Sequence, residues 1–167
     1  MPPAILEQRP RRCVIVAVEH ASEVDLASLP APFGLDEPFV GVIWDAIGGS
    51  TEEERLAFGQ KLLAAGCRYA VCGGRDGSAW DDAIDYAFVL LTLDVPEAER
   101  DARFIMTTWH EGEPVEEVVW FAIHCAHFDD LSFLRWLVVI RGGDEELRQR
   151  FERAITTEIK PLAAELE

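Results

Sequence analysis

Residues 109–111, with the sequence Trp-His-Glu, hold side-chain types that can carry acid–base chemistry. Imidazole exchanges a proton near neutral pH, so His110 is a candidate proton donor or acceptor that Glu111 or Asp76 would orient. Adjacent residues of a strand point to opposite faces, so His110 and Glu111 serve one ligand only if the chain turns there. We therefore predict His110, Glu111 and Asp76 as catalytic candidates, with the end of a strand as the alternative explanation. Trp109 would stack on a ring or exclude water.

Paired glycines precede three of the predicted helices, in the segments "DAIGGST", "GGRDGS" and "RGGD". Backbone N–H groups at such turns, together with the helix dipole, can bind an anion. An arginine nearby would hold a carboxylate or phosphate group with two parallel hydrogen bonds. The predicted ligand-binding residues are therefore Asp45, Gly48, Gly49, Gly73, Gly74, Arg75, Trp109 and Arg141. Glycines also make tight turns when nothing binds, and neither a Walker motif nor G-x-G-x-x-G occurs.

The segment "VCGGRDGSAWDDAIDYA", residues 71–87, resembles the first strand and turn of the nucleotide-ligand domains related to lysine-decarboxylase-like, SLOG-type proteins. The resemblance covers about a tenth of the chain. That family places the turn on its first strand and adds a second glycine-rich motif, whereas here the turn falls mid-chain and the second motif is missing. The resemblance implies the shape of a turn.

Other patterns of reactive residues are incomplete. His124 and His127 are three apart on a predicted helix, but a zinc site needs a third and usually a fourth ligand, so no metal is predicted. Cys72 precedes a helix start where a thiolate can be stabilised, but a small buried apolar side chain is the favoured interpretation. A phosphorelay receiver is disfavoured because the first strand ends in Glu-His and the last in Arg141 instead of lysine. No cofactor is predicted.

The charge balance restricts the class of partner. The 167 residues include 31 acidic and 15 basic ones, which leaves a net charge of −16. This charge repels nucleic acids and anionic membranes and suits a basic protein partner, or simply keeps the protein dispersed. The four cysteines form no C-x-x-C pair, and no run of about 18 apolar residues would span a bilayer. We therefore expect a reduced, cytoplasmic setting.

Strands and helices alternate along the sequence. Apolar, β-branched runs predict strands at residues 13–18, 39–44, 67–72, 103–109 and 133–140. Helices are predicted from a capping box at Ser50 or Thr51 to Gly66, from Ser78, from Pro114 and over residues 144–159. This alternation indicates one α/β domain over residues 1–167, with a three-layer sandwich around a mostly parallel sheet of about five strands, Rossmann-like or flavodoxin-like. Residues 1–12 are expected to be flexible.

Two functions remain open at this stage. The first is an acidic binding or regulatory domain that acts through a basic protein partner. The second is a small-molecule enzyme or sensor for a phosphate-bearing or nucleotide-like ligand at the carboxyl edge of the sheet, where parallel sheets bind their ligands. Whether the protein is an enzyme is left open.

Overall fold

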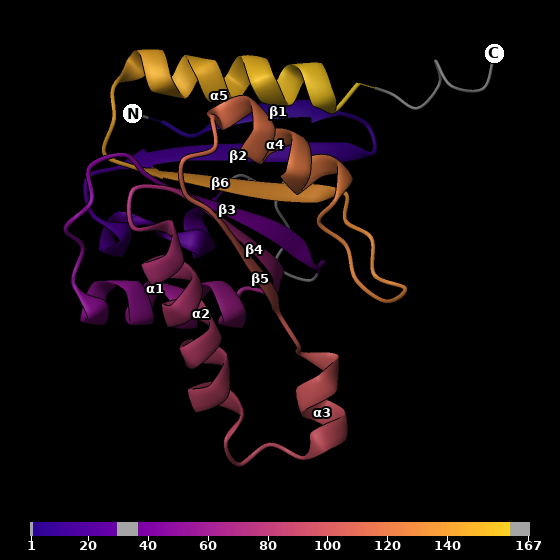
Figure 1. The fold of residues 1–167 in the computed structure, drawn as a ribbon. Coiled ribbons are helices and arrows are strands. Elements are labelled where there is room, and N and C mark those ends of the chain that lie inside the picture. Colours follow the sequence, from indigo (N-terminus) through magenta and orange to yellow (C-terminus); the bar gives the residue numbers. More distant parts are fainter. Residues whose placement is uncertain (1, 30–36, 161–167) are drawn as a thin grey trace.

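The computed structural model describes residues 2–29 and 37–160, which form a three-layer α/β sandwich (Figure 1). Its strands are β1 (Ala4–Gln8), β2 (Arg11–Val18), β3 (Phe39–Asp45), β4 (Cys67–Gly74), β5 (Met106–His110) and β6 (Arg135–Arg141). Its helices are α1 (Glu52–Ala64), α2 (Gly77–Thr92), α3 (Glu97–Ala102), α4 (Val115–His124) and α5 (Glu145–Glu158). Two short 3-10 turns, η1 (Ala21–Glu23) and η2 (Leu26–Ser28), follow β2. The predicted α/β class is confirmed.

The sheet has the order β1-β2-β6-β3-β4-β5, and every neighbouring pair except β1 and β2 is parallel. Of the five parallel strands, β6 comes last in the sequence but lies between β2 and β3 in the sheet. The Rossmann and flavodoxin arrangements have other orders, so neither finer description is confirmed.

β1 adds a sixth strand to the expected count of about five, and it lies in the segment that was expected to be flexible. It runs antiparallel to β2, with Ala4 opposite Ile15 and Gln8 opposite Arg11. Ala4 and Leu6 pack against the core while Ile5 points outward. The strand therefore covers the edge of β2, which would otherwise expose unpaired backbone groups.

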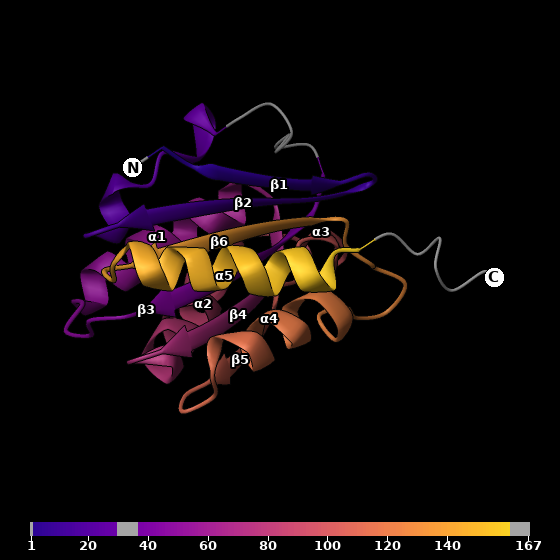
Figure 2. The same cartoon turned by 90° about the horizontal axis from the view of Figure 1, so that it is seen from above.

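Helices cover both faces of the sheet, as the views from the side and from above show (Figures 1 and 2). α1 and α2 lie on one face, and α4 and α5 on the other. The first core contains Phe58, Leu62, Trp80 and Ile84. The second contains Val118, Val119, Phe151 and Ile155. Burial on both faces explains why the strands are continuous apolar runs.

Local signals explain most of the helix boundaries. The Thr51 side chain accepts a hydrogen bond from Glu54 N at 3.1 Å and begins α1, and Asp144 accepts from Leu147 N at 2.9 Å and begins α5. α2 extends to Thr92, and α3 was not expected. β5 begins at Met106, three residues later than predicted.

The connections after the strands diverge at the carboxyl edge. The chain leaves β3 and β4 toward the face of α1 and α2, and it leaves β5 and β6 toward the face of α4 and α5. The three glycine segments and residues 109–111 lie at the carboxyl ends of parallel strands.

Among the described residues, no helix has the length and apolar character needed to cross a membrane.

Candidate functional site

Asp45 and Arg141 form a buried ion pair at the ends of β3 and β6. Arg141 Nη1 donates to Asp45 Oδ1 at 3.0 Å and to the carbonyl oxygen of Gly48 at 2.8 Å, and its Nε lies 3.4 Å from Glu54 Oε1. Asp45 also accepts from Gly48 N at 2.7 Å and from Trp80 Nε1 at 2.9 Å. Both side chains are buried, with Asp45 fully so. The pair therefore ties two strands, a loop and α2 together, and its groups are not directed at a ligand.

The glycine turns are closed by the protein's own groups. Gly49 N donates to Asp76 Oδ2 at 3.0 Å, so the turn before α1 binds the turn before α2. Gly74 has a φ of +78°, and a Cβ there would lie 2.3 Å from the carbonyl oxygen of Asp45. At Gly73 a Cβ would lie 3.0 Å from the ring of Trp44. These glycines allow close approach of two strand ends, and the N–H groups of Gly48 and Gly49 already have carboxylate acceptors.

The structure does not bring His110, Glu111 and Asp76 together. His110 is buried on the α4 face of β5, where its Nδ1 contacts Glu113 Oε2 and its Nε2 lies 2.9 Å from Thr108 Oγ1. Its ring centroid is 4.5 Å from that of Phe121. The sequence analysis missed Glu113, although its position three residues after a histidine at a strand end was a usable signal. A catalytic role for His110, Glu111 and Asp76 stays a prediction.

Glu111 instead caps α2. Its Oε1 accepts hydrogen bonds from Ser78 N and Ser78 Oγ, both at 2.8 Å. The bond from the backbone N–H of Ser78, followed by the bond from its hydroxyl, lowers the pKa of Glu111. The sequence predicted that Ser78 itself caps this helix, and this prediction is wrong. The anion at the start of α2 is a side chain of the same chain.

The remaining candidates are Arg75, Trp109 and Cys72, of which Cys72 lies opposite Trp109 in the pairing of β4 with β5. Arg75 is exposed, and its guanidinium has no hydrogen bond or ion pair with any described residue. Trp109 is 58% exposed and shares a face of β5 with Thr107, which bonds Asp85 of α2, so it points away from the side of His110. Cys72 is fully buried, and burial raises the pKa of its thiol well above the ordinary value. This favours the apolar role for Cys72.

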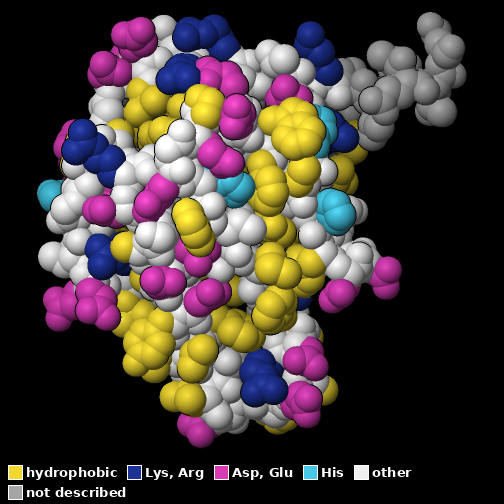
Figure 3. Space-filling model, viewed as in Figure 1, with side chains coloured by type: hydrophobic (Ala, Val, Ile, Leu, Met, Phe, Trp, Pro, Cys, Tyr) yellow, Lys and Arg dark blue, Asp and Glu magenta, His cyan; other side chains and the backbone are white. Residues whose placement is uncertain are grey.

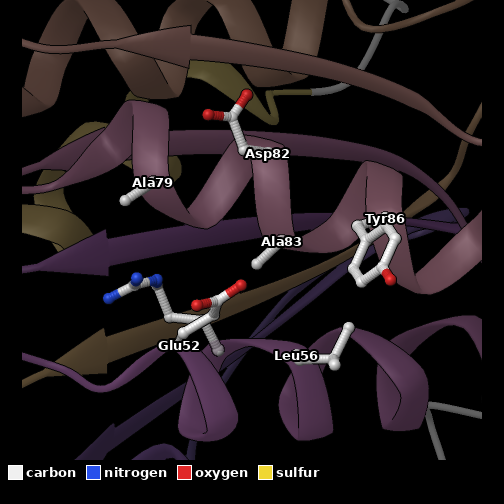
Figure 4. Close-up of a pocket in the computed structure, with 7 residues that line it drawn as sticks. Glu52, Leu56, Ala79, Asp82, Ala83 and Tyr86 are labelled. Carbon is white, nitrogen blue, oxygen red and sulfur yellow. The ribbon is translucent and has the colours of Figure 1, made fainter.

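A second candidate site lies between α1 and α2, where the sequence analysis placed none. A groove of about 290 Å³ is lined by Glu52, Arg55, Leu56, Ala79, Asp82, Ala83 and Tyr86. Leu56 of α1 and Tyr86 of α2 face each other across one end of it, while Glu52 and Ala79 mark the other end (Figure 4). Beyond Tyr86, Val89 and Leu93 are also exposed.

Four exposed residues and the partly buried Ala79 form one line along α2 and its C-cap. Ala79, Asp82, Tyr86, Val89 and Leu93 follow one another at intervals of three, four, three and four residues; we call this set the α2 seam. In the space-filling view, hydrophobic side chains gather over the C-terminal half of α2, with acidic side chains nearby (Figure 3). The spacing of the seam is visible in the sequence, but the exposure of its residues is not, because an amphipathic helix normally turns such a line toward the core.

No curated protein and no solved structure matches this chain. Residues 15–158 match the model of a protein family described as "Domain of unknown function (DUF7684)". This range includes part of β2, all of β3 to β6 and α1 to α5, and both candidate sites. Since the match covers well over half of the sequence, the chain belongs to the DUF7684 family.

Proposed function

We propose that this protein is a non-catalytic binding domain whose α2 seam and neighbouring groove dock a basic amphipathic helix of a protein partner. The observation that carries the proposal is the exposure of three large apolar side chains along one helix line. Tyr86 is 52% exposed, Val89 50% and Leu93 68%. Exposed apolar residues that cluster on one surface mark interaction sites more often than scattered ones do.

The spacing of the seam favours a helix as the occupant. Apolar residues that alternate at three and four residues lie along one side of a helix and interdigitate with a second helix. The groove beside the seam lies between α1 and α2. Grooves of this kind recognise a helix by its apolar side chains.

The charges around the groove favour a basic partner. Glu52 and Asp82 lie along it, and the cation that lines it, Arg55, already donates to the carbonyl oxygen of Ser50 at 2.5 Å and to Ser50 Oγ at 3.1 Å. A second copy of the chain would bring the same carboxylates and the same net charge of −16 against this surface. Repulsion therefore disfavours self-association, whereas lysines and arginines flanking an apolar helix face would be attracted.

A binding experiment with model helices tests this proposal. The probe is a fluorescently labelled peptide with leucines at heptad positions a and d and lysines elsewhere, and its charge-reversed counterpart carries glutamates. We expect the basic peptide to bind and the Val89→Glu variant to bind it at least about tenfold more weakly. Ile5→Glu is the matched control, because Ile5 is 44% exposed on β1, at the opposite edge of the sheet from β4 and β5. It should change the affinity less than about twofold.

Two results would contradict the proposal. One is equal binding of the basic and acidic peptides, or equal effects of Val89→Glu and Ile5→Glu. The other is a dimer in analytical ultracentrifugation that Val89→Glu dissociates, which would assign the seam to a second copy of the chain. Circular dichroism of both variants checks that each remains folded.

A further inference from the structure

A groove at the carboxyl edge of the sheet has the size of a small-molecule site. Its volume is about 500 Å³, and it lies between the ends of β3 and β4 and the first turns of α4 and α5. Ligand pockets of proteins commonly span about 300 to 1,000 Å³. We call it the edge groove; the α2 seam lies on the other face of the sheet and contributes no residue to it.

The apolar lining of the edge groove includes an aromatic ring in a fixed position. Trp44 packs edge-on against Phe151, with ring centroids 5.4 Å apart and an interplanar angle of 75°. Its ring also lies over Gly73, where a Cβ would come within 3.0 Å of the ring atoms. Trp44 is only half-buried, and Val115 and Leu147 line the groove with it. The lining therefore offers a rigid aromatic surface to a flat apolar molecule.

Of the four charged side chains that line the edge groove, three have a partner among the described residues and one does not. Asp45 is paired with Arg141. Glu113 contacts the His110 ring, and Arg150 binds Glu116 through two bonds of 2.6 Å. Arg75 alone among the charged groups of the lining has no partner in the described part of the chain.

Arg75 lines the edge groove beside the turn that precedes α1. Its aliphatic stem lies near the turn at Gly48, since a Cβ built on that glycine would be 3.4 Å from Arg75 Cδ. The stem is thereby placed at the groove while the guanidinium stays available. One guanidinium matches one carboxylate in a bidentate arrangement.

We propose that the edge groove binds a small aromatic carboxylate, with its ring against Trp44 and its carboxylate on Arg75. A polyphosphate is disfavoured because a single unpaired cation would face several negative charges beside Glu113. The inference is independent of the helix-docking function, since the two sites share no residue.

Calorimetric titration with 2-naphthoate tests this site. For a probe of this size we expect a dissociation constant of about 1 mM or lower. Arg75→Gln should weaken binding about tenfold. Arg103→Gln is the matched control, because Arg103 is an exposed arginine whose side chain likewise has no partner among the described residues. The affinity of the Arg103→Gln variant for 2-naphthoate should match that of the wild type.

Two further probes and an NMR map complete the experiment. The neutral 2-naphthamide should bind at least about tenfold more weakly than the carboxylate. Naphthoate should shift the amide resonances of Gly74, Arg75 and Gly112, which surround the edge groove. The proposal is overturned if naphthoate fails to bind at 5 mM, if Arg75→Gln and Arg103→Gln behave alike, or if 2-naphthyl phosphate binds more tightly than the carboxylate. A loss of naphthoate binding in Val89→Glu would also overturn it, because that residue lies outside the groove.

Discussion

Asp45 combines four donors on one carboxylate: the N–H groups of Ile47 and Gly48, the indole N–H of Trp80 and the guanidinium of Arg141. Leaving such a group buried without its partners costs several kcal/mol, so the bonds hold the strand ends in one arrangement. Asp45 and Arg141, which the sequence suggested as ligand-binding residues, thus hold the turns at the carboxyl edge of the sheet together.

Gly74 provides a test at the scale of single residues. Gly74→Ala should lower the free energy of unfolding by about 3 kcal/mol, because left-handed backbone strain adds to a clash of the new Cβ with the carbonyl oxygen of Asp45. Gly49→Ala is the control, since Gly49 has a similar φ of +73° but no atom within 4 Å of the added Cβ. It should cost about 1 kcal/mol in urea denaturation. Equal losses for the two variants would show that backbone strain alone determines the effect.

α2 shows how one element depends on a distant one. Its N-terminus is capped by Glu111, which follows β5 and is 33 residues away from Ser78. The residue at the N-cap position, Asp76, has a left-handed φ of 49° and makes no side-chain cap. Its carboxylate binds Gly49 instead. The loop after β5 and the turn before α1 therefore both act on the start of α2, the helix that carries the seam.

The cap predicts a pH dependence at the scale of this helix. Because the folded state lowers the pKa of Glu111 below its ordinary value of 4.5, the stabilisation is fully present above that value. It is lost as the pH falls through the lower pKa of the folded state. Glu111→Gln should therefore be less stable than the wild type at pH 7, and the difference in urea midpoint should shrink toward pH 3. A difference that stays constant or grows on acidification would contradict the capping role.

The molecule as a whole is strongly acidic, and the acidic side chains seen in Figure 3 lie among exposed apolar ones. Such a charge keeps copies of the protein apart and attracts basic partners over distances comparable with the Debye length. The exposed seam can therefore remain accessible without promoting self-association, which fits a surface reserved for a partner of opposite charge.

A change in salt concentration should separate the contribution of charge to docking from the contribution of apolar contact. The Debye length falls from about 10 Å at 0.1 M salt to about 3 Å at 1 M, so the affinity for the lysine-rich helix should fall about tenfold or more over this range. A peptide with the same leucines but glutamines in place of the lysines is the control, and its affinity should change less than about twofold. Titrations by fluorescence anisotropy at several salt concentrations measure both. A salt-independent affinity for the basic peptide would argue against charge complementarity.

Much of the fold could be predicted because its signals are local. The five parallel strands are apolar runs, and Thr51 and Asp144 begin α1 and α5 by bonds to residues three positions ahead. β1 was missed because a short alternating segment beside a proline has no strong signal without β2 next to it. The candidate site residues lie at the edge of the sheet where the sequence placed them. The sequence did not indicate which residue each of them contacts.

The sequence by itself determined the alternation of strands and helices, the glycine turns and the acidic charge, since each depends on residue type or on neighbours a few positions away. Only the tertiary structure decided that β6 lies between β2 and β3, that Arg141 binds Asp45 and that Glu111 caps α2. It also decided that Arg75 has no partner and that the seam faces outward. These features join residues tens of positions apart, and their geometry depends on the order of the strands and the packing of the helices, which no local pattern encodes.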